Sequence, residues 1–124
     1  MRTKYGAKKE TIDGITFDSL AEGRRYRDLK LMERAGEITS LRVHVPYELV
    51  VNGQVVCHYE ADFTYFRPML GTRFGTHVVE DVKGMRSGPA WSMFRMKAKL
   101  FKAIFRVDIE VYPPAPPRKP RRRK

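Results

Sequence analysis

The stretch from Val55 to Phe66 alternates between polar and apolar side chains. Its polar positions are His58, Glu60, Asp62 and Thr64, and its apolar positions are Cys57, Tyr59, Ala61, Phe63 and Tyr65. Successive side chains of a β-strand point to opposite faces, so this alternation predicts a long strand with one polar and one apolar face. The apolar face of such a strand has to be buried within a sheet, and the chain must therefore supply further strands.

Three further segments have the composition of strands. Residues 77–83 alternate as well, with one face formed by Val79, Asp81 and Lys83 and the other by Val78, Glu80 and Val82. A loop over residues 68–75 separates this strand from the first, which allows a hairpin-like pairing. Residues 38–51 are rich in β-branched residues, but Pro46 cannot donate to a ladder and predicts an edge strand or a bulge. Asn52-Gly53 marks a turn, and residues 107–112 form the last predicted strand.

Two helices and a small hairpin complete the expected elements. Asp13-Gly14 lies between two short β-prone runs and predicts a type I′ hairpin over residues 11–17. Asp18 or Ser19 can cap a helix over residues 20–35, which Gly36 ends. Residues 90–105 predict a basic amphipathic helix with a core-facing aromatic stripe, formed by Trp91, Phe94, Phe101 and Phe105. This order of elements predicts an α/β (α+β) fold.

Charge divides the chain into three parts. Its 124 residues suit one domain, which we place at residues 11–112, between a basic arm (1–10) and a Pro-rich basic tail (113–124) expected to be extended and disordered. The formal net charge is +11, and six of the positive charges lie within residues 118–124. Such a charge attracts polyanions, either nucleic acid or an anionic membrane surface.

Several classes of protein are excluded. The single Cys57 allows no internal disulfide, and no Cys/His spacing suggests a structural zinc. No apolar stretch approaches the roughly 18 residues of a membrane span, and the N-terminus lacks a signal-peptide core, so we expect a soluble, cytoplasmic protein without membrane partners. No phosphate-binding glycine loop, nucleophile elbow or HExxH motif is present, which removes support for nucleotide hydrolysis, ester hydrolysis and zinc proteolysis.

The candidate catalytic group consists mainly of acidic residues on the two central strands. Asp81 and Lys83 share a strand face, and pairing with the preceding strand can bring Asp62 beside them. Glu22 lies next to the apolar arc of the first helix and can complete the group. Carboxylate oxygens are the ligands that Mg²⁺ prefers, and a nearby lysine can orient a water molecule or stabilise developing negative charge. An Asp-x-Lys sequence alone, however, also occurs on the solvent face of many unrelated strands.

The order of these residues is more specific: a glutamate on a helix, an aspartate on one strand, Asp-x-Lys on the next strand and then a basic helix. In this order the sequence resembles the PD-(D/E)XK nuclease superfamily, whose core is a mixed sheet flanked by helices. Within it the sequence is most similar to small phage proteins related to Holliday-junction resolvases. The matching segments are residues 4–9, 13–19, Glu22 with Tyr26, and residues 31–38, 59–63 and 79–84. The resemblance implies a restriction-endonuclease-like mixed central β-sheet and a bacterial or phage-infected host cell.

The resemblance also implies roles for individual residues. Asp62 and Asp81 would ligate Mg²⁺, for which Mn²⁺ could substitute, Lys83 would be the catalytic lysine, and Glu22 would help to hold metal or water. The sequence has Ala61 where such proteins often have proline, and His44 where glutamine is expected. His44 is then either catalytic or an ordinary strand histidine, and Glu60 is either an extra carboxylate or a solvated surface residue.

These observations favour a Mg²⁺-dependent endonuclease that hydrolyses phosphodiester bonds in branched DNA, acting as a homodimer because two symmetric strands would be cut. The alternative is a non-catalytic basic DNA- or RNA-binding module whose carboxylates are surface residues. In either case basic side chains outside the carboxylate group would contact phosphates. We expect these to be Lys8, Lys9, Arg95, Lys97, Lys99, Lys102, Arg118, Lys119, Arg121, Arg122, Arg123 and Lys124.

Overall fold

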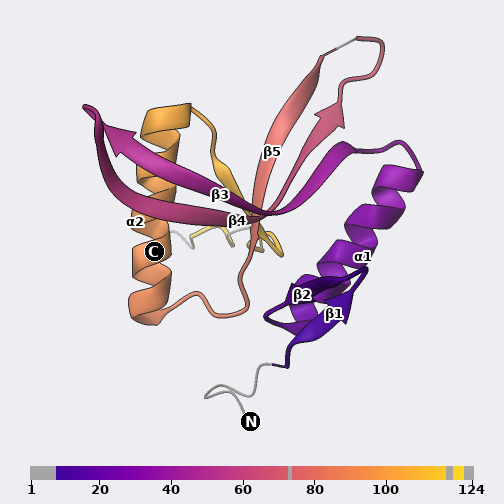
Figure 1. The fold of residues 1–124 in the computed structure, drawn as a ribbon, viewed down its shortest axis with the longest axis horizontal. Helices are drawn as coiled ribbons and strands as arrows, with labels where there is room; N and C mark the ends of the chain where they lie inside the picture. Colours follow the sequence, from indigo (N-terminus) through magenta and orange to yellow (C-terminus); the bar gives the residue numbers. More distant parts are fainter. Residues whose placement is uncertain (1–7, 73, 117–118, 122–124) are drawn as a thin grey trace.

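The computed structural model describes residues 8–72, 74–116 and 119–121. Within them the elements are β1 (Glu10–Ile12), β2 (Ile15–Phe17), α1 (Leu20–Arg34), β3 (Thr39–Val51), β4 (Gln54–Pro68), β5 (Gly75–Val82), α2 (Gly88–Phe105) and β6 (Ile109–Tyr112). β1 and β2 form a small hairpin, and the larger sheet has the order β3-β4-β5-β6 (Figure 1). β5 and β6 are parallel and the other neighbours are antiparallel. The expected α+β class with a mixed sheet is confirmed.

The predicted turns and helix start have the expected geometry. Asp13 and Gly14 have φ of 52° and 77°, and Asn52 and Gly53 have φ of 51° and 78°, as two-residue hairpin turns with positive φ at both central positions require. The side chain of Ser19 accepts a hydrogen bond from the backbone N–H of Glu22 at 3.2 Å, which caps α1. The sequence patterns therefore position the first helix and both hairpins correctly.

Strand β3 lies at the edge of the larger sheet, as Pro46 predicted. Pro46 is paired in register with Glu60 of β4, and no bulge occurs at the proline itself. Irregularities lie instead between Thr39 and Arg42 and between Leu49 and Val50. The other element boundaries differ from the predictions by a few residues: α2 begins at residue 88, β4 continues to residue 68, and β6 begins at residue 109.

Two hydrophobic cores lie on opposite faces of the larger sheet. The α1-side core consists of Phe17, Tyr26, Leu29, Ile38, Phe63, Tyr65, Val78 and Val82. The α2-side core consists of Val45, Leu49, Tyr59, Ala61, Val79, Phe94 and Phe101. Because Val78 and Val79 are consecutive residues of one strand, their side chains point to opposite faces, so the two helices cover β5 from its two sides. The aromatic residues predicted as core at Phe94 and Phe101 are buried, whereas Phe105 is 42% exposed.

The long β3–β4 hairpin changes its core-facing side near its middle. On β4, Tyr59 and Ala61 belong to the α2-side core, whereas Phe63 and Tyr65 belong to the α1-side core. Residues two apart on a regular strand share a face, so the hairpin turns over between Ala61 and Phe63. We call this position the face switch. The prediction of one polar and one apolar face along the whole of residues 55–66 was therefore wrong, because the apolar positions of this strand serve two cores in succession.

The face switch coincides with an unusual backbone conformation on the neighbouring strand. The pairs Val43–Phe63 and Val45–Ala61 place His44 opposite Asp62. His44 has φ of 51°, a left-handed conformation that an L-residue adopts at an energetic cost. Both strands therefore turn over together, and Asp62 is the β4 residue at this position.

The terminal segments add no helix or strand in the part that the structure describes. Lys8 and Lys9 of the arm are exposed, and residues 113–116 and 119–121 of the tail have no regular secondary structure. Arg118, Arg122, Arg123 and Lys124 lie outside the described residues. Among the helices described here, neither is long and apolar enough to cross a membrane.

Candidate active site

Asp62 is fixed to the end of strand β5. Regular pairing of β4 with β5 reaches Phe63 and Glu80. At the next position the side chain of Asp62 accepts a hydrogen bond from the backbone N–H of Val82 at 2.8 Å. Where the regular pairing of β4 with β5 ends, a side-chain carboxylate therefore accepts the hydrogen bond of a β5 backbone N–H. Since Asp62 is opposite Asp81 in the continued register, the two predicted metal ligands come together as expected.

Asp81 is nearly buried, with 4% of the residue exposed. Its carboxylate accepts a hydrogen bond from the hydroxyl of Tyr59 at 2.6 Å, and its other oxygen lies 3.2 Å from Nζ of Lys83. The Lys83 ammonium also lies over the ring of Phe94, 4.6 Å from its centroid. These contacts confirm that Asp81 and Lys83 share a face.

Burial and the neighbouring negative charge disfavour the ionised form of Asp62. The pKa of Asp62 is raised to about 8, first by burial and second by the negative charge of Asp81, with a smaller contribution from Glu22. The N–H of Val82 acts in the opposite direction without cancelling these effects. Burial and the charge of Asp81 also raise the pKa of Tyr59, which keeps its hydroxyl a hydrogen-bond donor. A cation placed between the two aspartates would relieve this repulsion.

Glu22 lies in the first turn of α1 and belongs to the same electrostatic group. Its pKa is raised first by burial and then by the charge of Asp18, while the positively charged form of His44 would lower it. Within the described residues, no three His, Cys, Asp or Glu side chains come together closely enough to form a metal cage on their own. The role of Glu22 as a third ligand stays a prediction. His44 lies near Glu22, and its chemical role remains open.

The donor set nevertheless fits Mg²⁺. Magnesium is commonly held by one or two protein carboxylates and completes its octahedron with water and substrate phosphate oxygens. Asp62 and Asp81 supply two adjacent carboxylates, and the pKa of Asp62 is raised first by burial and second by the negative charge of Asp81. An ion held by these two carboxylates would complete its coordination with water and phosphate oxygens.

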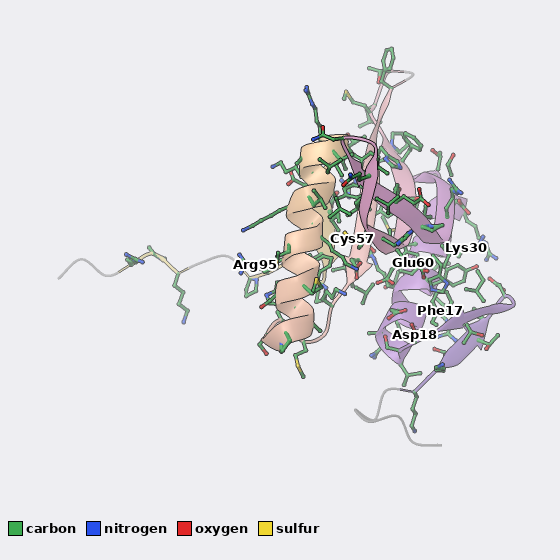
Figure 2. The ribbon with its side chains drawn as sticks, turned by 60° about the vertical axis from the view of Figure 1, so that its left-hand side comes forward. Phe17, Asp18, Lys30, Cys57, Glu60 and Arg95 are labelled. Atoms are coloured by element: carbon green, nitrogen blue, oxygen red, sulfur yellow. The ribbon has the colours of Figure 1, made fainter. Side chains whose placement is uncertain are left out.

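A shallow groove of about 240 Å³ gives access to the site from the α2 side. It is lined by Tyr59, Glu60, Asp81, Lys83, Ala90, Met93, Phe94 and Lys97. Asp62 and Glu22 do not line it. Glu60 is exposed and lies near Asp81 in the groove, so both predicted alternatives, an extra carboxylate or a surface residue, remain open. Figure 2 shows Glu60 on the part of β4 between the two helices.

The chain matches the family described as Protein of unknown function (DUF1064) over residues 2–112. The chain belongs to this family. No curated protein and no solved structure matches it. The matched part of this DUF1064 protein includes the candidate site and ends at the last residue of β6.

The basic residues of α2 that we expected to contact DNA lie on different parts of the helix surface in the DUF1064 protein. Lys97 lies in the groove and donates a hydrogen bond to the backbone carbonyl of His58 at 2.9 Å. Arg95 and Lys99 are exposed, and Figure 2 shows Arg95 on the side of α2 away from the sheet. Lys102 pairs with Asp108 at 2.9 Å. The predicted set on α2 therefore separates into one cation beside the carboxylates and three on other parts of the helix surface.

Sequence analysis missed a buried ion pair beside the site. Arg25 donates two hydrogen bonds to Glu80, at 2.8 and 2.7 Å, and its guanidinium lies 3.8 Å from the ring centroid of Tyr112. Tyr65 donates to the same glutamate at 2.8 Å. Arg25 lies one helical turn after Glu22, and Glu80 directly precedes Asp81. This pair therefore connects the two elements that carry the candidate acidic residues. The available signal was Glu80, which shares a strand face with the apolar Val78 and Val82. A buried charge is nearly always paired, so this position predicts a basic partner.

Proposed function

We propose that the protein is a Mg²⁺-dependent endonuclease that hydrolyses phosphodiester bonds in DNA. The observation that carries the proposal is the adjacent pair of the half-buried Asp62 and the buried Asp81, with the ammonium of Lys83 3.2 Å from the carboxylate of Asp81. Two crowded carboxylates and a lysine are the groups that such a reaction needs. The competing explanation, that these carboxylates are ordinary surface residues, does not suit Asp81, because only 4% of this residue is exposed.

Each group has a separate task in this proposal. Asp62 and Asp81 would hold Mg²⁺, or Mn²⁺ in its place, with the Val82 N–H and the Tyr59 hydroxyl fixing the carboxylate orientations. The bound ion would polarise the phosphodiester and lower the pKa of a coordinated water. Lys83 would orient that water or stabilise the negative charge that develops on the phosphate. Glu22 would assist in holding metal or water from the α1 side.

The proposed substrate is branched DNA. The net charge of +11 supports binding to a polyanion. The choice of a junction rests on the resemblance of the sequence to small phage proteins related to Holliday-junction resolvases. Cutting two symmetric strands would require two sites, which a two-fold homodimer supplies most simply.

A cleavage assay tests the proposal. Wild-type protein should cut one or more of four substrates, a four-way junction, a flap, a nicked duplex and a plain duplex, when Mg²⁺ is present and not when it is chelated. Asp62→Asn and Asp81→Asn should abolish cleavage while retaining folding and binding, because each change removes a negative ligand and keeps the side-chain shape. Asp28→Asn, at an exposed position of α1, is the matched control and should cut normally.

The same assay identifies the competing function. A non-catalytic basic nucleic-acid-binding module would bind these substrates with Mg²⁺ and leave them uncut. If either active-site variant cut DNA at the wild-type rate, the carboxylate it alters would not be a metal ligand.

A further inference from the structure

The tip of the β4–β5 hairpin exposes large apolar side chains that neither core uses. Leu70 is 100% exposed, Phe74 is 77% exposed and Met69 is 56% exposed. They lie within six consecutive positions of one turn, next to Phe66, which is 42% exposed. Isolated exposed apolar residues are ordinary, but a group of this size at one place marks a contact surface.

Hydrogen bonds join the described residues of the turn that presents these side chains. The N–H of Met69 donates to the carbonyl of Phe74 at 3.0 Å, and the N–H of Thr72 donates to the carbonyl of Met69 at 3.2 Å. The hydroxyl of Thr72 contacts the carbonyls of both Met69 and Phe74, at 3.2 and 3.0 Å. These hydrogen bonds hold Met69, Thr72 and Phe74 together in one turn.

The base of the tip is narrow. A Cβ atom at Gly75 would lie 2.9 Å from the carbonyl oxygen of Arg67, so the close approach of the two strands requires glycine there. The hairpin projects from the sheet, away from both helices (Figure 1). A narrow projection with apolar side chains at its end has the shape of a wedge rather than of a flat docking face.

Charge indicates the partner of this wedge. Residues 66–77 contain no aspartate or glutamate. Arg67, at the base of the tip, pairs with Glu110 of β6 at 3.4 Å. The whole chain carries a net charge of +11, which attracts a polyanion. Duplex DNA combines an anionic exterior with an apolar stack of bases, and proteins insert Phe, Leu or Met side chains between its base steps.

The wedge is carried by the strands that hold the candidate active site. Asp62 and Leu70 are eight residues apart on β4 and the following turn, which corresponds to about 26 Å along an extended strand. This length is less than one turn of DNA, about 34 Å. A branched duplex lying along β4 and β5 can therefore contact the acidic pair and the hairpin tip at the same time.

We propose that the β4–β5 tip inserts Leu70 and Phe74 between bases at the branch point of junction DNA and unstacks them. The choice of branched DNA rests on the proposed function, but insertion does not require catalysis. The tip thereby selects branched DNA over plain duplex, because bases at a branch point are unstacked at a lower cost than bases inside a continuous helix.

Fluorescence of 2-aminopurine placed at the branch of a four-way junction tests this proposal in EDTA, where no cleavage can occur. Saturating wild-type protein should raise the fluorescence as the base unstacks. The double variant Leu70→Ser/Phe74→Ser should lose most of this rise and weaken junction binding by about tenfold or more. Val56→Ser is the matched control, because Val56 is a 58% exposed apolar residue at the other hairpin end, and it should behave as wild type. Urea unfolding of all three proteins verifies that the fold is retained.

Three results would overturn the proposal. In the first, the double variant keeps the full fluorescence rise at saturation. In the second, sedimentation shows a dimer that the double variant loses while its junction fluorescence is unchanged, which would make the tip a contact between copies. In the third, the double variant loses binding to anionic vesicles and keeps the junction signal, which would make it a membrane contact. The two proposals fail separately. Cleavage by the wild type together with an unchanged fluorescence rise in the double variant would refute the wedge and leave the nuclease proposal standing. A fluorescence rise that the double variant loses, with no cleavage by the wild type in Mg²⁺, would refute the nuclease proposal and leave the wedge standing.

Discussion

Replacing Asp62 by Asn should stabilise the metal-free protein, and the stabilisation should grow as the pH rises. Asp62 has a pKa of about 8 in the folded chain, against an ordinary value of 3.8, because of burial and the charge of Asp81. At a pH between these two values, the carboxyl of Asp62 therefore keeps its proton in the folded chain and has lost it in the unfolded chain. Asn keeps a carbonyl oxygen that can accept from the N–H of Val82, while it removes the charge that is disfavoured in the folded state.

The sign and size follow from proton linkage. Below pH 4 the carboxyl is protonated in both states, and its titration contributes no difference. Between pH 4 and pH 8 the folded state binds the extra proton, so the free energy of unfolding of the wild type falls by at most about 1.4 kcal/mol per pH unit relative to the variant. Asp62 is partly exposed, so solvent screening weakens the effect. Between pH 5 and pH 8 the free energy of unfolding of the variant should therefore rise relative to that of the wild type by about 1–2 kcal/mol in total.

Urea unfolding of both proteins in EDTA, at pH 5 and at pH 8, measures this difference. Other groups with raised pKa values, such as Glu22, are present in both proteins and largely cancel in the comparison. Excess Mg²⁺ at pH 8 should then stabilise the wild type, by about 2.7 kcal/mol at one hundred times its dissociation constant, and leave the variant unchanged. A variant that is less stable than the wild type at pH 8, or a difference independent of pH, would refute the electrostatic reasoning.

Three further outcomes are expected. Lys83→Ala should slow single-turnover cleavage far more than it weakens binding, and Lys97→Ala should do the reverse; equal small losses of affinity with unchanged rates would favour the binding module. Arg25→Met should lower the free energy of unfolding in urea by about 3–5 kcal/mol because it leaves Glu80 buried and unpaired, and Arg25→Met/Glu80→Gln should recover part of this loss; a single variant as stable as the wild type would contradict the buried pair. Truncation after Tyr112 should flatten the slope of log affinity against log salt by about two to five units and leave the saturated cleavage rate unchanged, whereas an unchanged slope would mean that the tail does not contact DNA.

Local signals in the sequence were sufficient for most of the fold. Asp13-Gly14 and Asn52-Gly53 require positive φ at consecutive positions, and Ser19 followed by an apolar period marks a helix start whatever the rest of the chain does. Alternation in residues 77–83 also placed Asp81 beside Lys83 correctly. These features depend on a few neighbouring residues, which is why they could be predicted without knowledge of the tertiary structure.

The features that could not be predicted depend on contacts between distant segments. Alternation shows which residues of a strand share a face, but it does not show which helix covers each half of the strand. The face switch at Asp62 was missed for this reason. The pairing of Arg25 with Glu80 joins residues 55 positions apart. Similarly, composition identified the cations of α2 but could not show that Lys97 alone lies in the groove with Asp81, because that depends on how the helix is rotated against the sheet.

The face switch has a consequence for how the chain unfolds. A protein with two cores on opposite sides of a sheet could lose one helix and keep the other, and would then unfold in two steps. Here the same pair of strands supplies Val45 and Ala61 to one core and Phe63 to the other, on either side of His44. Releasing either helix frees the hairpin to untwist at this position, which removes the packing surface of the other helix. The two cores therefore form one cooperative unit, in which the slowest-exchanging amides should belong to the centre of β4, around the residue proposed to bind the metal.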